Sequence, residues 1–490
     1  MPKCVRAAML AAVSMLINAC TVGPDYKRPT IDTPAGYKEM DGWTVAHPQD
    51  TAVRGKWWEI YNDPELNALQ DQVSLSNQNL AAAEAQYRQA RALVQVARSA
   101  FFPVVSAGVS ASRSQSPSTL GSSSTTTASR GPANTYTASL DAAWEADVWG
   151  RVARSVEGSR ASAQASAADI ETLRLSVQGQ LAVNYFQLRA LDAQRQLLDA
   201  TIAAYGKSLD LTKNRYAGGV ASKTDVAQAD TQLKSTQAQA LDTGVQRAQL
   251  EHAVALLVGK PASTFSIPVA PLAAVPPAVP VGVPSEVLER RPDIAAAERR
   301  VAAANAQIGV AQAAFYPSLM LSASGGFESA NFSRWLTLPS RFWALGPALA
   351  QTLFDGGLRR AQTEQARAAY DATVAAYRQT VLAGFQEVED NLAALRILEQ
   401  ESRVQDEALR SARESMGLAL NQYKAGTIDY LSVVIVQAAL LTNERTAVDI
   451  LNRRMAASVQ LVKALGGGWD VAALPGSKEV SDNGSRSPAK

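Results

Sequence analysis

The amino-acid sequence predicts an α+β membrane protein that combines a few two-faced strands with unusually long helices. Three observations support this fold class. The 490-residue chain contains an internal duplication, because 79–110 and 293–324 align without a gap. Each copy has two segments in which apolar and polar residues alternate, as is typical of half-buried strands. Each copy also has a helical pattern longer than a compact globular domain requires.

The duplication is clearest where an alanine-rich helical pattern meets an aromatic pair and a proline. The segment "SAFFPVVSAGVSAS" (99–112) is repeated as "AAFYPSLMLSAS" (313–324), and "NRYAGG" (214–219) is repeated as "NQYKAG" (421–426). A repeat of about 200 residues is too long for a solenoid unit, so it predicts a duplicated domain.

The N-terminus has the pattern of an export signal. Lys3 and Arg6 precede an apolar stretch, 7–17, that is too short to span a bilayer. The following "INAC" (17–20) is typical of a bacterial lipobox, which makes Cys20 the predicted lipidated first residue of the mature chain. A plain secretory signal with a chance cysteine is the alternative. Resemblance to lipoproteins adds that Thr21, in place of aspartate, favours the outer membrane.

Long helices are predicted in both copies. In the first, 64–100 is helical, with Asp63 as its cap and Pro64 in its first turn. From Leu173 to Tyr216 apolar residues recur with a period near 3.6. A helix from Arg151 to Tyr216 would be about 100 Å long at 1.5 Å per residue. Such a length suits a tube that spans a compartment.

Four strands are predicted, at about 104–112, 135–149, 318–327 and 343–354, and a serine-rich loop (112–134) joins the first two. Their length and alternation match transmembrane strands, which are apolar outside and polar inside. Aromatic residues near the strand ends predict a membrane-interface girdle. Those on the helix side are Phe101, Phe102, Trp149, Phe315, Tyr316 and Phe354; Trp335 and Trp343 are near the other side.

No later segment reads as a transmembrane helix, since the most apolar window, 267–283, contains five prolines. A membrane crossing would therefore need strands, and four strands cannot close a barrel. Three chains would give twelve strands with an open lumen, whereas two would give eight, filled by side chains. A soluble sheet with one face in a core is the alternative; it would not explain the duplication, the lipid anchor and the long helices together.

Composition and motifs argue against several function classes. The formal net charge of +2 provides no basic field for nucleic acid. His47 and His252 are isolated, so no metal site is expected. The chain has no P-loop and no GxSxG nucleophile motif, and no cofactor is expected. An enzyme is not predicted. In "ERRPD" (289–293) a helix cap is favoured over an ion pair.

Several longer motifs resemble those of the TolC-type outer-membrane factors, specifically the lipidated NodT/OprM-like branch of multidrug efflux. The motifs are "CTVGPDYKRP" (20–29), "WWEIYNDPELNAL" (57–69), "ERRPDIAAAERRVAAANAQIGVAQAAFYPSL" (289–319), "LFDGG" (353–357) and "QYKAGTIDYLSVV" (422–434). The resemblance implies a homotrimer with a shared twelve-stranded barrel, four strands per protomer, in outer-membrane lipid. A long α-helical barrel would extend from it into the periplasm.

The same resemblance implies a function. The protein would be a passive exit duct for drugs or other small molecules, working with a periplasmic adaptor (membrane fusion) protein and an inner-membrane pump of the resistance-nodulation-division (RND) type. An exit channel for protein secretion and a lipid-anchored periplasmic scaffold without a pore are the alternatives.

The predicted organisation has six parts, with residues from about 474 onward expected to be disordered. They are a signal peptide (1–19), an N-terminal equatorial segment (20–63), the first repeat (64–260), a proline-rich equatorial linker (261–284), the second repeat (285–468) and a C-terminal tail (469–490).

The resemblance also implies a periplasmic aperture at the paired tyrosine-glycine turns. Thr224 and Asp225 match the family's Thr-Asp pair, and Tyr423 matches the tyrosine that links to it; Asp429 is a further candidate. Three copies of Asp225 at a narrow mouth would favour cations. Its alternative role is to cap a helix that starts at Val226.

This sequence departs from the family pattern after the second turn. Ile428 stands where an arginine is expected, and Ser432 and Ile435 stand where tunnel acids are expected. These departures leave the exact aperture network open.

Overall fold

The computed structural model describes residues 21–39, 55–115, 132–277, 279 and 284–482. The predicted signal peptide (1–19) and Cys20 lie outside the described residues. So do His47, most of the serine-rich loop and the last part of the predicted tail, 483–490.

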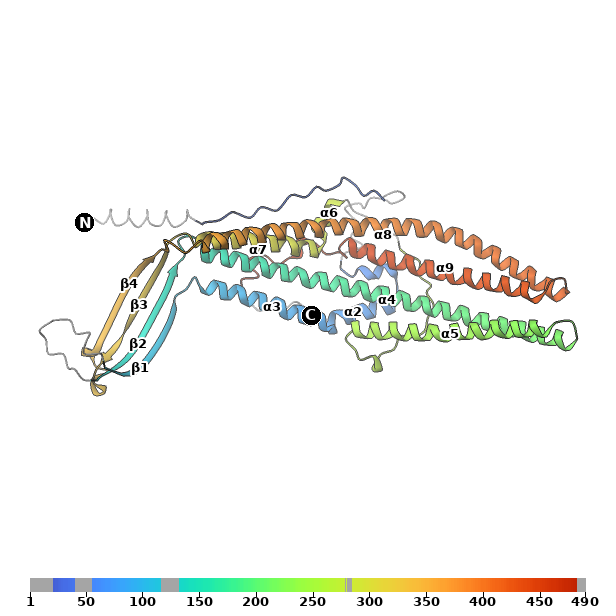
Figure 1. The fold of residues 1–490 in the computed structure, drawn as a ribbon, viewed down its shortest axis with the longest axis horizontal. Coiled ribbons are helices and arrows are strands. Elements are labelled where there is room, and N and C mark those ends of the chain that lie inside the picture. Colours follow the sequence, from blue (N-terminus) through green and yellow to red (C-terminus); the bar gives the residue numbers. More distant parts are fainter. Residues whose placement is uncertain (1–20, 40–54, 116–131, 278, 280–283, 483–490) are drawn as a thin grey trace.

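The protein is elongated, with a sheet at one end and a bundle of helices running away from it (Figure 1). Helices α4 (Arg151–Ala217) and α8 (Leu358–Ala425) run from the sheet to the far tip, where α5 (Lys223–Leu257) and α9 (Tyr430–Ala464) turn back. The predicted helix from Arg151 to Tyr216 is thereby confirmed. The shorter helices are α2 (Pro64–Ser76), α3 (Gln78–Ser99), α6 (Pro284–Arg290) and α7 (Pro292–Ala313).

Short 3₁₀ turns complete the helical content of the described chain. They are η2 (Trp57–Tyr61), η4 (Ala262–Thr264), η5 (Phe332–Arg334), η6 (Leu338–Ser340) and η7 (Val471–Ala473). No described helix combines the length with the apolar character needed to cross a bilayer.

The sheet is antiparallel, with strand order β1-β2-β3-β4. Its strands are β1 (Val104–Ser114), β2 (Ala133–Ala146), β3 (Ser318–Ser329) and β4 (Arg341–Ala350). Each repeat supplies one hairpin, and β2 pairs with β3 to join them. Strands β1 and β4 are the edges, so each has one row of backbone groups without a partner strand in this chain.

The strand register separates apolar from polar side chains, because residues paired across an antiparallel sheet share a face. On one face, Ala142 pairs with Val105 and Ala323, and Ala323 pairs with Leu345. We name this the apolar face; it includes Val105, Ala107, Val109, Ala138, Leu140, Ala142, Leu319, Leu321, Ala323, Trp343, Leu345 and Leu349.

The neighbouring rows of residues point to the opposite face. There Asp141 pairs with Ser106 and Ser324, and Ser324 pairs with Ala344. We name this the hydroxyl face. A hollow of about 460 Å³ is lined by these four residues and their neighbours. The predicted two-faced character of the strands is thus confirmed.

Two strands end earlier than predicted, before Trp149 and Phe354. After β2, the Asp147 carboxylate accepts the Val152 and Ala153 N–H groups at 2.9 and 2.7 Å, so the chain turns into α4. After β4, residues 351–354 have no partner strand among the described residues, because the first residue of β3, Ser318, already pairs with Ala350.

The predicted helix 64–100 is two helices, α2 and α3, divided at Asn77. The Asn77 side chain accepts the N–H groups of Asn79 and Leu80, and its amide donates to the Leu257 carbonyl at 2.7 Å. This contact with the end of α5 bends the chain at a residue whose side chain caps the new helix.

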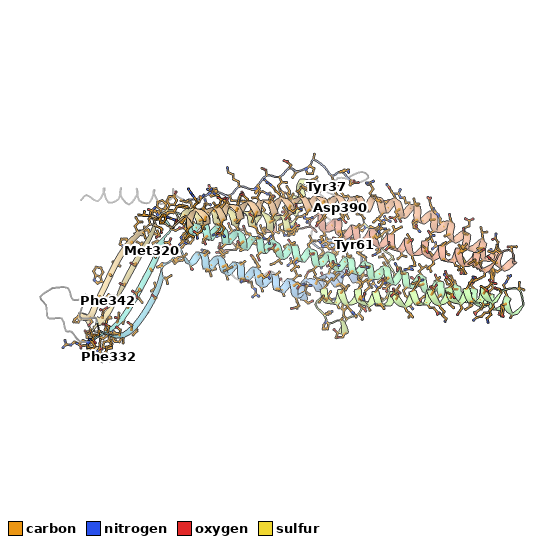
Figure 2. All side chains as sticks on the ribbon, viewed as in Figure 1. Tyr37, Tyr61, Met320, Phe332, Phe342 and Asp390 are labelled. Carbon is orange, nitrogen blue, oxygen red and sulfur yellow. The ribbon has the colours of Figure 1, made fainter. Side chains whose placement is uncertain are left out.

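The main core lies near the middle of the molecule, where the two repeats and η2 meet. The Tyr61 ring lies 5.0 Å from the Phe186 ring, and its hydroxyl is 3.0 Å from Ser458 Oγ on α9. Trp57 is fully buried beside this pair. Tyr61 lies within the bundle, well away from the sheet (Figure 2).

Residues 21–39 form a strap along α7 and α8 (Figure 1). The strap begins at the sheet end, where the Val22 N–H donates to the Trp149 carbonyl at 3.1 Å. Farther along, the Tyr26 hydroxyl donates to Glu298, and the Lys38 N–H donates to Glu389 at 2.7 Å. The strap thus connects the sheet end of the bundle to its middle.

The "ERRPD" segment contains an ion-pair network, so the favoured cap is the wrong prediction. Arg291 is buried and contacts Asp293 at 2.6 Å and Glu387 at 2.7 Å; its guanidinium also donates to the Ala464 carbonyl at 3.1 Å. Burial lowers the pKa of Arg291, but these carboxylates raise it more, so the group stays charged. Arg291 therefore ties α7 to α8 and to the end of α9.

The expected disorder from about 474 is also wrong for 474–482. Val480 is fully buried between Val94 and Ala163. The Ser481 carbonyl accepts from Gln95 and Arg98 at 2.6 and 2.7 Å. These side chains of α3 hold a segment whose composition alone suggests disorder.

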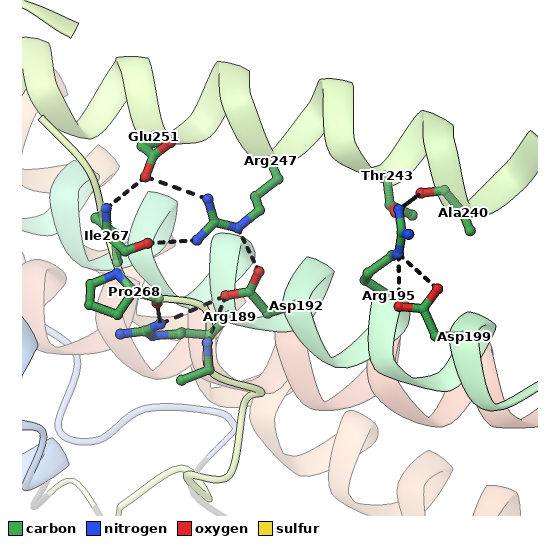
Figure 3. Close-up of polar contacts among 11 residues, drawn as sticks. Arg189, Asp192, Arg195, Asp199, Ala240, Thr243, Arg247, Glu251, Ile267 and Pro268 are labelled. Carbon is green, nitrogen blue, oxygen red and sulfur yellow. Dashed lines mark hydrogen bonds and ion pairs between the residues drawn. The ribbon is translucent and has the colours of Figure 1, made fainter. Parts of the chain in front are cut away.

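The proline-rich linker is held by a charged network on α4 and α5 (Figure 3). Asp192 is almost fully buried and accepts from Arg247 at 2.7 Å and from the Ala270 N–H at 3.1 Å. Arg247 and Arg189 donate to the Ile267 and Pro268 carbonyls at 2.7 and 2.5 Å. The network supplies hydrogen bonds to backbone groups of a linker segment, 265–272, that forms no helix or strand.

Asp192→Ala should destabilise this part of the fold by about 3 kcal/mol, because it leaves two largely buried guanidinium groups without their shared carboxylate. We expect faster protease cleavage within 265–272, measured by mass spectrometry of the fragments. The control is Asp199→Ala, which removes a half-exposed partner of Arg195 and should change stability by less than about 1 kcal/mol. Equal cleavage of both variants would contradict this role of Asp192.

Candidate aperture at the tip of the helical hairpins

The first tip turn joins α4 to α5 and is closed by glycine and a capping box. Gly219 adopts a φ of 76°, and the Arg215 carbonyl accepts the Val220 N–H at 2.8 Å. The Ser222 hydroxyl accepts the Asp225 N–H at 3.1 Å, while the Asp225 carboxylate accepts the Ser222 N–H at 2.8 Å. These contacts fix the start of α5.

The second tip turn joins α8 to α9 by similar means. Gly426 adopts a φ of 79°, and the Thr427 N–H donates to the Gln422 carbonyl at 3.0 Å. Asp429 caps α9 by accepting the Ser432 N–H at 3.0 Å and its hydroxyl at 2.5 Å. These hydrogen bonds lower the pKa of Asp429. The carboxylate therefore caps α9 at neutral pH, and the cap is lost only as the pH falls through that lowered pKa.

The two hairpins are joined just behind these turns by a cluster that we name the tip cluster: Ser208, Thr212, Arg215, Tyr423 and Tyr430. The buried Tyr423 hydroxyl donates to Thr212 at 3.2 Å, and its ring lies 5.4 Å from the Tyr430 ring. The Tyr430 hydroxyl lies 3.3 Å from Ser208 Oγ. Burial raises the pKa of Tyr430, so its hydroxyl remains protonated and able to donate.

Arg215 adds the charged part of the tip cluster. Its guanidinium lies 4.7 Å from the Tyr423 ring centre and donates to the Tyr423 and Lys424 carbonyls at 2.7 and 3.2 Å. These carbonyls belong to the last turn of α8, where a helix lacks its own donors and carries partial negative charge. One side chain of α4 thus donates hydrogen bonds to two carbonyl groups at the end of α8.

The predicted aperture residues occupy the tip but do not contact one another as the resemblance implies. Tyr423 hydrogen-bonds to Thr212, and no hydrogen bond joins it to Thr224 or Asp225 in the described structure. Thr224 is exposed on the first turn of α5, which starts at Lys223 rather than Val226. Asp225 is therefore the acidic member of a capping box, and Ser222 is the N-cap.

Sequence reasoning missed Ser208, Thr212, Arg215 and Tyr430. A basic residue in the last turn of a helix is a recognised partner for helix carbonyls, and Arg215 has that position in "NRYAGG". Its actual partner is the other hairpin, and no local pattern identifies that partner.

The aromatic residues predicted for the helix side lie where the sheet joins the bundle. The Trp149 ring stacks on the Tyr316 ring at 4.8 Å, and its indole N–H donates to the Pro317 carbonyl at 2.7 Å. Phe101, Phe102, Phe315 and Phe354 are exposed at the same end, whereas Trp343 is exposed toward the opposite end of the apolar face.

In the part of the chain that the structure describes, no three His, Cys, Asp or Glu side chains gather as metal ligands would. His252 is exposed on α5.

Comparison with known proteins identifies the family. The sequence matches the family described as outer membrane efflux protein over 69–260 and 283–467, one match in each half. The chain belongs to the outer membrane efflux protein family. Its two matched regions together make up most of the chain.

Curated members of the outer membrane efflux protein family are similar over almost their whole length. The chain is 31% identical to the probable efflux pump outer membrane protein SepC of Pseudomonas putida, covering 94% of this chain and 96% of SepC. It is 30% identical to the pyoverdine export outer membrane protein OpmQ of Pseudomonas aeruginosa, covering 94% and 96%.

Solved structures of outer-membrane proteins have the same fold as this chain. The outer-membrane channel OprN superposes with a TM-score of 0.84 at 31% identity, covering 92% of this chain and all of OprN. The outer membrane protein VceC of Vibrio cholerae superposes with a TM-score of 0.79 at 27% identity, covering 85% of this chain and 99% of VceC. The predicted TolC-like fold and family are confirmed.

Arg215→Gln should loosen the tip without unfolding the bundle, because it removes charge-assisted hydrogen bonds to the end of α8. We expect amide exchange in 424–432 to accelerate about tenfold, equivalent to about 1.5 kcal/mol. The measurement is hydrogen–deuterium exchange with mass spectrometry. Lys213→Gln, at an exposed position on the same helix, is the control. Unchanged exchange in Arg215→Gln would contradict the role of the tip cluster.

Proposed function

We propose that the protein is the outer-membrane exit duct of a tripartite efflux system, through which drugs or other small molecules leave passively. It would work with a periplasmic adaptor and an inner-membrane RND-type pump, which supplies the energy. The observation that carries this proposal is the sheet: it has an apolar face, a hydroxyl face and two edges without partners. Such a sheet suits lipid on one side and water on the other.

Barrel closure requires other copies of the chain, since an unpaired strand edge is not tolerated in lipid. Three copies would place β4 of each protomer beside β1 of the next and give twelve strands. Twelve strands leave an open lumen, whereas the eight of a dimer would be filled by side chains. The hydroxyl face, with Asp141 and its serine neighbours, would line the lumen.

The helices suit a tunnel through the periplasm. α4 has 67 residues and α8 has 68, which corresponds to about 100 Å each. Exposed apolar residues on α8 recur at heptad positions, Ile397, Val404 and Leu418. Such an exposed stripe suits packing against a neighbouring protomer.

The relatives' names support an efflux role with varied cargo. They include a toluene efflux pump protein, an antibiotic efflux pump protein and a pyoverdine export protein. Such unlike cargo is consistent with a passive duct whose pump selects the substrate. The family assignment places the chain among transport proteins, and we propose no catalytic role.

Lipidation at Cys20 is part of the proposal. Thr21 packs closely against Gly150, since a Cβ atom added to Gly150 would lie 2.3 Å from the Thr21 methyl group. The Val22 N–H donates to the Trp149 carbonyl. The strap therefore starts beside the aromatic residues that we propose as the inner membrane-interface girdle. An acylated residue 20 would be at the level of the lipid surface.

Mass spectrometry of the full-length protein purified from membranes tests the anchor. We expect a diacylglyceryl and N-acyl modification on Cys20 that is absent from Cys20→Ser. The strap contacts should survive in that variant, because they begin at Thr21. An unmodified N-terminal cysteine in the wild type would contradict lipidation.

We place the closed aperture at the tip, with Asp225 and Asp429 as the acidic groups facing the mouth and Thr224 beside them. The tip cluster would hold α8 and α9 against α4 in the closed state. Opening would require a partner that binds the open state more tightly. The adaptor is the proposed partner.

Planar-bilayer recording of the purified protein tests both the duct and the aperture. We expect heat-resistant trimers in unboiled gels and cation-preferring channels. Asp225→Asn should reduce the cation preference, because asparagine keeps an acceptor for the Ser222 N–H and removes only the charge. Asp225→Ala should change conductance as well. Asp230→Asn, an exposed position on α5, is the matched control.

The outcomes separate the two claims. Monomers without conductance would contradict the duct and favour a scaffold without a pore. Channels whose conductance and selectivity are the same in Asp225→Asn, Asp225→Ala and the wild type would remove Asp225 from the aperture.

A further inference from the structure

The end of the sheet away from the helices carries arginines without partners. Arg113 is near the end of β1, Arg341 begins β4, and Arg334 lies in the connection between β3 and β4. All three are exposed, and within the described structure none of their side chains has a hydrogen bond or ion pair. We name these residues the arginine collar.

The strand register directs two collar residues to the apolar face. Arg113 lies on the same face of β1 as Ala111 and Val109, because these residues are two positions apart. Arg341 pairs with Phe327, which pairs with Ala138. These arginines therefore stand on the face that we propose meets lipid, just beyond its apolar part. Both are on edge strands, so every seam between protomers would have them nearby.

Acidic groups do not offset the arginine collar. In 104–115, 132–138 and 327–343 the sequence has one acidic residue, Glu328. Glu328 pairs with Thr137 on the hydroxyl face, so it points away from Arg113 and Arg341. The outward side of this end is thus uniformly positive over the described segments.

Several arginines at the helix end of the sheet differ from the collar, because they have partners within the described chain. Arg151 pairs with Glu145 at 2.6 Å, Arg359 pairs with Asp355 at 2.6 Å, and Arg98 donates to the Ser481 carbonyl at 2.7 Å. At the far end, the three guanidinium groups of the arginine collar are exposed and available to an external ligand.

Aromatic side chains lie beside the collar. Tyr136, on the apolar face, contacts the Phe332 and Trp335 rings at 5.5 and 6.0 Å. The Trp335 indole N–H donates to the Phe327 carbonyl at 3.3 Å, which holds the β3–β4 connection on the sheet. Phe332 lies at the far end of the sheet (Figure 2), and the residue is 69% exposed although these contacts hold the cluster in place.

We propose that this end of the apolar face binds the phosphorylated headgroups of outer-leaflet glycolipid. The arginine collar pairs with phosphate, for which the planar guanidinium provides two parallel donors. The aromatic cluster lies at the boundary between headgroups and acyl chains, where amphipathic rings are favoured. An outward arginine would be costly in hydrocarbon, so these positions belong at the headgroup level.

This inference rests on the proposed function, because it requires the apolar face to meet the outer membrane. It adds a ligand class and three residues that an exit duct does not itself need. A duct in a membrane without phosphorylated glycolipid would still conduct.

The test measures binding of lipid A to the full-length trimer in detergent, by native mass spectrometry. Diphosphorylated lipid A is compared with dephosphorylated lipid A of the same acyl composition. We expect tighter binding of the diphosphorylated form. The triple variant Arg113→Gln, Arg334→Gln, Arg341→Gln should lose roughly fivefold in affinity per arginine for that form only, the size expected for basic residues near an anionic surface.

A second triple variant is the matched control. Arg367→Gln, Arg378→Gln and Arg410→Gln remove the same charge from exposed positions of α8, and none of these side chains has a hydrogen bond or ion pair in the described structure. We expect wild-type affinity for both lipids. Equal losses in the two triple variants would show a general charge effect and overturn the proposal.

Two further outcomes would also test whether the arginine collar binds phosphate. If the wild type binds the two lipids with equal affinity, phosphate binding by the arginine collar is refuted, and no variant is needed for that conclusion. Channel recording on the same samples separates this result from the proposed function: wild-type conductance with no phosphate preference refutes only the collar, whereas absent conductance refutes the duct.

Discussion

The unpaired edges of β1 and β4 are the constraint on which the rest of the account depends. A four-stranded sheet leaves backbone N–H and C=O groups without partners on both sides. In water such groups can bond to solvent, but in hydrocarbon each one costs several kcal/mol. The apolar face places this sheet against hydrocarbon. The proposed pairing with sister protomers therefore rests on the backbone of one chain.

The direction of the helical hairpins is set by the same sheet. The two repeats share one sheet and send two hairpins in the same direction, so each protomer would contribute two hairpins to the wall of the proposed tube. Contacts at three levels hold the helices together along the bundle. Arg291 ties helices near the middle, the strap connects the sheet end to the middle, and the tip cluster joins the hairpins at the far end.

Much of the fold could be predicted from the sequence because its signals are periodic. The alternation in β1 to β4 is fixed by the two faces of the sheet, and the period near 3.6 from Leu173 to Tyr216 is fixed by one buried helix face. The features that could not be predicted depend on distant partners. Asn77 divides a helix because it reaches Leu257, and 474–482 is ordered because α3 and α4 bind it.

The candidate site shows the same limit. The tyrosine-glycine turns could be located, because glycine and capping residues are local signals. The partner of Tyr423 could not, since Thr212 lies in the other repeat and only the packing of α4 and α8 against α9 brings them together. Resemblance pointed to Asp225, whose carboxylate is occupied by the Ser222 N–H in this structure.

Hydrogen–deuterium exchange of the edge strands, in the purified protein in lipid nanodiscs, tests the central claim most directly. If sister protomers pair with β1 and β4, all amides of these strands should be protected to the same extent as those of β2 and β3. If instead the sheet remains open, alternate amides of β1 and β4 will exchange as fast as an unstructured chain while β2 and β3 stay protected. That second pattern would contradict the account.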